Sequence, residues 1–161
     1  MKALKYLILF LLIIAASVAP AYAEDDDNTL YVFGSKESLD LGKARWASFE
    51  DNGITVITKD IKDFDAYKNK TNILVMATLK DKAAEDILGA DSPSLKHAKR
   101  MESSVYANVA DKFENGQSIF LFLGRDAADA ERKAVDTRED WWPVLASCFD
   151  VTLIMKDLFQ Y

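Results

Sequence analysis

Four basic side chains follow short apolar runs in a chain that is acidic overall. The 161 residues carry a net charge of −6, yet a Lys or Arg stands shortly after each of four apolar runs. If the runs are parallel strands, their carboxyl ends meet at one edge of a sheet, where α/β proteins bind ligands. The pattern predicts a site for an anion such as a phosphate group. The four cations are Lys36, Lys59, Lys80 and Arg125.

The candidate ligand site includes the small and polar neighbours of these cations. Its residues are Gly34, Ser35, Lys36, Lys80, Gly124, Arg125 and Asp126. Three of the cations stand at or just before a predicted helix start, where the helix dipole disfavours positive charge by about 0.3–1 kcal/mol. Such a conflict is compatible with a functional role. The alternative is an ordinary exposed rim, whose long side chains extend into water at little cost.

The glycines do not form a nucleotide-binding motif. The segment Phe33-Gly34-Ser35-Lys36 has one glycine, whereas dinucleotide sites need three spaced glycines and P-loops need Gly-Lys-Ser/Thr after a four-residue gap. Gly34 and Gly124 are therefore interpreted as strand-to-helix turns. We predict no cofactor, although a flavin site stays open because phosphate loops built on Ser and Thr have looser signatures.

No catalytic set or metal site is predicted. The single cysteine, Cys148, ends an apolar stretch and is interpreted as a small core residue. The single histidine, His97, lies among Lys96, Lys99 and Arg100 and has no second histidine for a metal site. Paired carboxylates are numerous, but a chain with 26 acidic residues produces them by coincidence.

Trp141 and Trp142 are the candidate partner-binding residues. Adjacent helical positions point about 100° apart, so one indole can enter the core while the other is partly exposed. An exposed indole is a good anchor for a protein partner. The alternative is that both indoles pack inside the protein.

Five short apolar runs predict the strands that position these residues. They are 30–33, 54–58, 72–77, 118–123 and 151–155. Helical stretches separate them, so we expect a three-layer α/β fold of Rossmann-like or flavodoxin-like type, with a mostly parallel five-stranded sheet and helices on both faces. The expected helices are 38–50, 80–88, 126–135 and 138–148, with a turn or two over 60–68.

A longer helix is predicted between the third and fourth runs. Leu95, Ala98, Met101, Val105, Val109 and Phe113 recur at spacings of three and four, which is typical of one apolar helix stripe. Ser92-Pro93 would begin this helix, and Asn115-Gly116 would end it.

The first 23 residues are interpreted as a secretory signal peptide. They combine Lys2 and Lys5, an uncharged apolar stretch and Ala21-Tyr22-Ala23 as a cleavage site. Removing them leaves an acidic leader over 24–29 and a single α/β domain over 30–161, with a net charge of −8. We therefore expect a protein that is periplasmic, extracellular or on the cell surface, with no membrane span after cleavage.

The composition narrows the class of protein further. An acidic chain argues against a nucleic-acid partner, and 29% charged with 11% aromatic residues argues against disorder. Asn69-Lys70-Thr71 is an N-glycosylation sequon in a predicted loop, so Asn69 is a candidate modification site.

One segment resembles a known family of envelope proteins. Residues 119–134 resemble the strand-Gly-x-x-Ala-x-Asp-Thr-x-x-Ala segment in the Rossmann-like domains of archaeal surface-layer (S-layer) proteins, with Gly124, Ala127 and Asp129 at matching positions. Ala130 replaces the Thr, and the final Ala is shifted to Ala134. The resemblance implies a non-enzymatic component of a cell-envelope lattice.

Two functional hypotheses follow from the sequence. The first is an exported, non-catalytic α/β module that binds another envelope component or itself. The alternative is a periplasmic binding protein or enzyme that holds a small anionic ligand at the carboxyl edge of the sheet.

Overall fold

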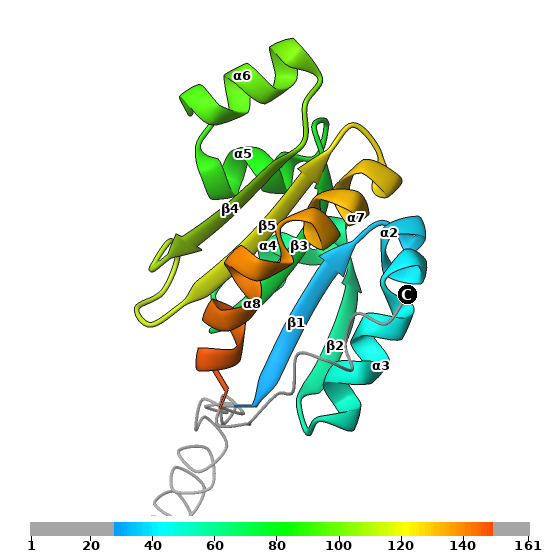
Figure 1. Cartoon of the computed structure of the whole chain (residues 1–161). Helices are drawn as coiled ribbons and strands as arrows, with labels where there is room; N and C mark the ends of the chain where they lie inside the picture. Colours follow the sequence, from blue (N-terminus) through cyan, green and yellow to red (C-terminus); the bar gives the residue numbers. More distant parts are fainter. Residues whose placement is uncertain (1–27, 150–161) are drawn as a thin grey trace, which may run out of the picture.

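A computed structural model describes residues 28–149, which contain a five-stranded sheet (Figure 1). The strand order is β2-β1-β3-β5-β4, and the first four of these strands run parallel to one another. β4 runs antiparallel to β5 at one edge. The strands are β1 (Thr29–Gly34), β2 (Thr55–Asp60), β3 (Asn72–Thr78), β4 (Val105–Ala110) and β5 (Ser118–Gly124).

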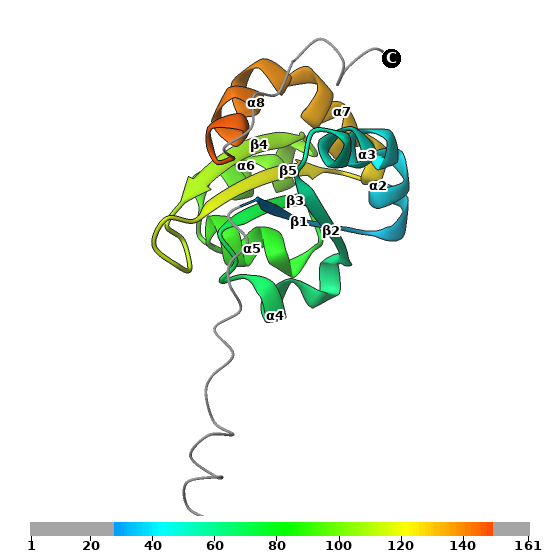
Figure 2. The same cartoon turned by 90° about the horizontal axis from the view of Figure 1, so that it is seen from below.

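Helices cover both faces of this sheet, as Figure 2 shows from below. One face carries α2 (Lys36–Leu41), α3 (Lys43–Asp51), α7 (Ala127–Asp136) and α8 (Arg138–Ser147). The other carries the short 3-10 helix η1 (Ile61–Asp63) with α4 (Phe64–Tyr67), α5 (Lys82–Leu88) and α6 (Pro93–Met101). The predicted three-layer, mostly parallel α/β fold is confirmed.

The central strands are apolar along their whole length because both of their faces are covered. On β3, Leu74 and Met76 enter the core beneath α3, α7 and α8. The alternate residues Ile73 and Val75 enter the core beneath α5 and α6. All four side chains are at most 1% exposed, so the continuous apolar run corresponds to a strand buried on both faces.

The long helix predicted from Ser92-Pro93 to Asn115-Gly116 is correct at its start, where Ser92 caps α6, and wrong beyond Met101. Helix α6 ends at Met101, Glu102 takes a left-handed conformation with φ 49°, and the chain continues as β4. Within the supposed helical stripe, Val105, Ala107 and Val109 alternate onto one face of the sheet. Residues four apart, such as Val105 and Val109, share a face in a strand as well as in a helix, so this spacing did not distinguish the two.

The turn at Gly116 also differs from the prediction. It belongs to the loop between β4 and β5, where Gly116 has φ 77°. The Asp111 carboxylate accepts a hydrogen bond from the Gly116 amide at 2.7 Å. Asn115-Gly116 therefore reverses the chain between two antiparallel strands and does not end a helix.

Smaller boundary differences affect the first helix and the leader. The predicted helix 38–50 is two helices that meet at Gly42, where a Cβ atom would lie 2.3 Å from the Trp46 ring. The predicted leader 24–29 overlaps β1, which begins at Thr29, a residue only 5% exposed. The predicted strand 151–155 and the signal peptide lie outside the described residues.

Candidate functional site

The structure brings the predicted ligand residues together at the carboxyl edge of the sheet. β1, β3 and β5 are adjacent, and they end at Gly34, Thr78 and Gly124. Thr78 pairs with Gly124, and the Leu79 amide donates to the Gly124 carbonyl at 2.9 Å. The loops that carry the candidate residues therefore leave the sheet side by side.

Ser35 has a structural role at this edge. Its hydroxyl oxygen accepts the Ser38 amide at 3.1 Å and caps the amino end of α2. Gly34 provides the space for this turn, because a Cβ there would lie 3.0 Å from the Ser38 Cβ. The glycine and the serine thus position α2 against β1.

The loop after β3 closes on itself in the same way. The Asp81 carboxylate accepts the Thr78 amide at 2.6 Å and the Thr78 hydroxyl at 2.9 Å. The ligand-site prediction did not include these two residues. The signal was a hydroxyl residue and an acid three positions apart at a strand end, a spacing that favours local side-chain to backbone bonds.

Arg125 and Asp126 are both engaged with the start of α7. The Asp126 carboxylate accepts the Asp129 amide at 2.8 Å and caps the helix. Arg125 forms two hydrogen bonds with the Asp129 carboxylate, which is 8% exposed and also accepts from Arg132 at 3.1 Å. The Arg125 hydrogen bond holds the pKa of Asp129 below its ordinary value, against the opposing effect of burial.

Gly124 is required by close packing of α7. A Cβ at this position would lie 2.3 Å from the Ala130 amide nitrogen. The glycine therefore lets α7 approach the end of β5, and this contact accounts for its place in the sequence without a ligand.

Two of the predicted cations keep their ammonium groups in solvent. Lys36 and Lys80 are exposed, and neither has an ion pair within residues 28–149. They follow the neighbouring strands β1 and β3. Lys59, at the end of β2, instead lies over the Tyr67 ring at 5.1 Å from its centroid. Of the four predicted cations, only Lys36 and Lys80 therefore remain in solvent without an ion pair or ring contact among the described residues.

A cavity of about 240 Å³ lies next to this edge, between α4 and α5. Its lining is Ile61, Lys62, Phe64, Asp65, Asp81, Lys82, Ala83 and Asp86. Lys82 pairs with Asp65 at 3.0 Å and with Asp86 at 3.3 Å. These hydrogen bonds raise the pKa of Lys82, and the Lys82 and Lys68 hydrogen bonds lower the pKa of Asp65.

The charge state of this cavity limits its chemistry. A lysine whose pKa is raised stays protonated at neutral pH, so Lys82 is unsuited to act as a nucleophile or a general base. Across residues 28–149, no group of three or more His, Cys, Asp or Glu side chains is placed to hold a metal ion. The cavity can hold water or a small polar molecule, and its three carboxylates already have partners, Lys82 for Asp65 and Asp86 and Thr78 for Asp81.

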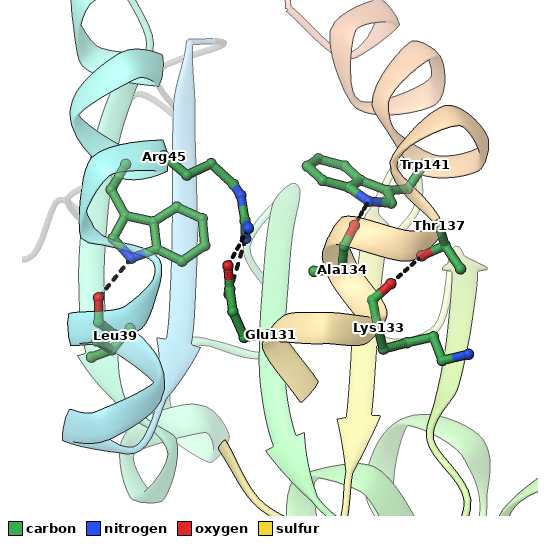
Figure 3. Close-up of polar contacts among 8 residues, drawn as sticks. Leu39, Arg45, Glu131, Lys133, Ala134, Thr137 and Trp141 are labelled. Atoms are coloured by element: carbon green, nitrogen blue, oxygen red, sulfur yellow. Dashed lines mark hydrogen bonds and ion pairs between the residues drawn. The ribbon is translucent and has the colours of Figure 1, made fainter. Parts of the chain in front are cut away.

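Both tryptophans are buried, so the expectation of a partly exposed indole is wrong and the alternative, that both indoles pack inside the protein, is correct. Trp141 is 0% and Trp142 is 1% exposed. The Trp141 indole donates to the Ala134 carbonyl at 2.8 Å, as Figure 3 shows, and its ring packs against Phe122. Trp142 stacks on Phe49 of α3 with ring centroids 5.5 Å apart. Helix α8 therefore has neighbours on two sides. The Trp141 indole packs against the sheet, and the Trp142 indole packs against α3.

A buried ion pair that the sequence does not indicate joins α3 to α7. Arg45 is 7% exposed and donates two hydrogen bonds to Glu131, which is 18% exposed (Figure 3). The guanidinium group also lies over the Trp46 ring at 5.3 Å from its centroid. The partners are 86 positions apart, so no local spacing indicates the pair.

The remaining candidates are surface residues. Asn69 is exposed in the turn between α4 and β3, so the sequon is accessible. His97 is exposed and lies 3.3 Å from Arg100. Cys148 is half-buried, and its thiol donates to the Val144 carbonyl at 3.3 Å.

The chain matches no protein-family model, no curated protein and no solved structure. The class that the described residues define is a Rossmann-like α/β protein with a mostly parallel sheet. No helix in the described part of the chain is long and apolar enough to cross a membrane.

Proposed function

We propose that this chain is an exported, non-catalytic α/β module that binds another component of the cell envelope or a second copy of itself. The observation that carries the proposal is the outer edge of β2. Within residues 28–149, β2 has β1 as its one neighbouring strand. Its first four residues are Thr55-Val56-Ile57-Thr58, all of them β-branched.

The described residues of this edge lack the proline and the mid-strand charges that often protect an exposed strand. It is six residues long and has no proline, and its charged residues stand at its end, Lys59 and Asp60. The Thr55 amide donates to the Asn28 carbonyl at 2.8 Å on the β1 side. Because backbone groups alternate sides along a strand, the N–H groups of Val56 and Thr58 point outward. Such an edge can accept a strand from another chain.

The carboxyl edge supports the non-catalytic part of the proposal. Its serine, threonine and aspartates form helix caps or tight loops, and Arg125 is held by Asp129. Among the described residues, every buried side-chain nitrogen or oxygen has a hydrogen-bond partner. A prepared catalytic site would hold polar groups directed at a substrate.

Sedimentation of the exported protein, alone and with an envelope extract, tests the proposal. We expect either self-association or a complex with an envelope component. Thr58→Pro removes one outward N–H without removing a bond to β1, so it should abolish the association. Thr58→Val keeps that N–H and is the matched control. A strict monomer that retains nothing from the extract would refute the proposal.

The export step needs its own measurement. Mass spectrometry of the exported protein should find an amino terminus at Glu24, as cleavage after Ala23 requires. An intact Met1 in the membrane fraction would contradict a free, exported product.

Lys36 and Lys80 favour one second candidate function, the binding of a small anion at the carboxyl edge. A thermal-shift panel of nucleotides, flavins and phosphorylated metabolites tests it. A ligand at 100 times its Kd should add about 2.7 kcal/mol to the free energy of unfolding. Absence of any shift across the panel would eliminate this candidate.

A further inference from the structure

An aromatic strip with a lysine at each end lies on the face of the sheet that carries α4. The Lys70 ammonium lies 5.4 Å from the centroid of the Tyr31 ring. The Tyr31 and Tyr67 rings are 6.0 Å apart, and the Lys59 ammonium lies 5.1 Å from the Tyr67 ring. We refer to these four residues as the Tyr31–Tyr67 strip.

The strip is accessible because the crossover above it is short. Only residues 61–71 join β2 to β3, and they form η1 and the four-residue α4 (Figure 2). Parallel sheets normally have both faces covered by full helices. Here Tyr31 and its neighbour on β2, Ile57, are half-buried, whereas the central strands are fully buried.

Charge and chain position favour one occupant for the strip. The four residues that precede the described chain, Glu24 to Asp27, are all acidic. Asn28, the first described residue, is fixed beside the start of β2, because its side chain donates to the Gly53 carbonyl at 2.8 Å. The acidic segment therefore joins the fold three residues before Tyr31.

Reach and length also match. Lys70 precedes β3 and lies at the same amino edge of the sheet as Asn28. Four extended residues span about 13–14 Å, which is most of the strip, because its three steps from Lys70 to Lys59 add to at most 16.5 Å. Asn28 is also a residue type that favours chain reversal.

We propose that the acidic segment Glu24–Asp27 folds back onto the Tyr31–Tyr67 strip of its own chain, with its carboxylates against Lys70 and Lys59. The segment covers the part of the sheet face that the short crossover leaves accessible.

Carbodiimide cross-linking of the exported protein tests the contact, since the reagent couples carboxylates and amines that already touch. Peptide mapping should find amide links from residues 24–27 to Lys59 or Lys70 at a yield that dilution does not change. Lys36 and Lys80, which follow the carboxyl ends of β1 and β3 and lie outside the strip, serve as internal controls. Links spread equally over all four lysines, or links whose yield falls on dilution, would overturn the proposal.

A second readout does not depend on the cross-linked amines. Cleavage of the acidic segment by a Glu- and Asp-specific protease should be several-fold faster in Lys59→Gln/Lys70→Gln. The matched variant Lys59→Arg/Lys70→Arg keeps both charges and should restore the slow rate of the original protein. Equal rates in all three proteins would show that the lysines do not hold the segment.

Discussion

The buried pair of Arg45 and Glu131 gives the sharpest prediction about stability. Replacing Glu131 by Gln keeps the shape of the side chain but leaves the guanidinium group buried without its counter-charge. Breaking a buried pair costs about 3–5 kcal/mol, and removing one partner of an exposed pair costs about 0–1 kcal/mol. Because Glu131 is 18% exposed and Gln can still accept a hydrogen bond, we expect a loss of about 2–3 kcal/mol.

Urea denaturation and thermal melting measure this loss. The midpoint should fall by roughly 6–10 °C for a domain of this size. Glu85→Gln is the matched control, because Glu85 pairs with Lys99 on the surface, where the two side chains are 43% and 39% exposed.

A double variant separates burial from the need for charge. Arg45→Leu/Glu131→Leu removes both charges, so it should recover at least half of the stability that Glu131→Gln loses. If Glu131→Gln destabilises the protein no more than Glu85→Gln does, the pair does not hold α3 against α7 and the reasoning fails.

Three further measurements test other parts of the structure. Gly124→Ala should cost about 1–3 kcal/mol, because its methyl group would meet a backbone nitrogen of α7 at 2.3 Å; an unchanged urea midpoint would contradict that packing. The Arg125 hydrogen bond lowers the pKa of Asp129, so the stabilisation is present above the unfolded-state pKa and is lost as pH falls through the lower folded-state pKa. Melts below about pH 4 should show the original protein losing stability faster than Asp129→Asn, whereas parallel curves would refute this. Burial, followed by the Asp140 charge, raises the pKa of Tyr106 to about 12, and ultraviolet titration of Tyr106→Phe against the original protein should show that late ionisation missing.

The parallel part of the fold could be predicted because its strands are apolar without interruption. In β3 and β5, burial on both faces leaves no polar alternation, and the flanking loops mark where each strand ends. β4 could not be predicted in this way. It lies at an edge, is only half-buried, and its apolar residues at 105 and 109 also fit a helical spacing.

The sequence predicted where the candidate site residues lie, but not which of their polar groups are bonded to neighbouring residues. Topology alone brings Lys36, Lys80 and Arg125 to one edge, and the sequence indicated that topology. Whether a polar group is available depends on local bonds such as Arg125 with Asp129. Trp142 is buried because α3 lies beside α8, and this contact joins segments that are far apart in the chain.

Hydrogen exchange at the outer edge of β2 tests the central claim most directly. The amides of Val56 and Thr58 point away from β1, so they should exchange rapidly in the isolated protein. When the protein associates with a partner or with itself, both amides should become protected, and Thr58→Pro should prevent the association. Association that leaves the exchange of Val56 and Thr58 unchanged would contradict it.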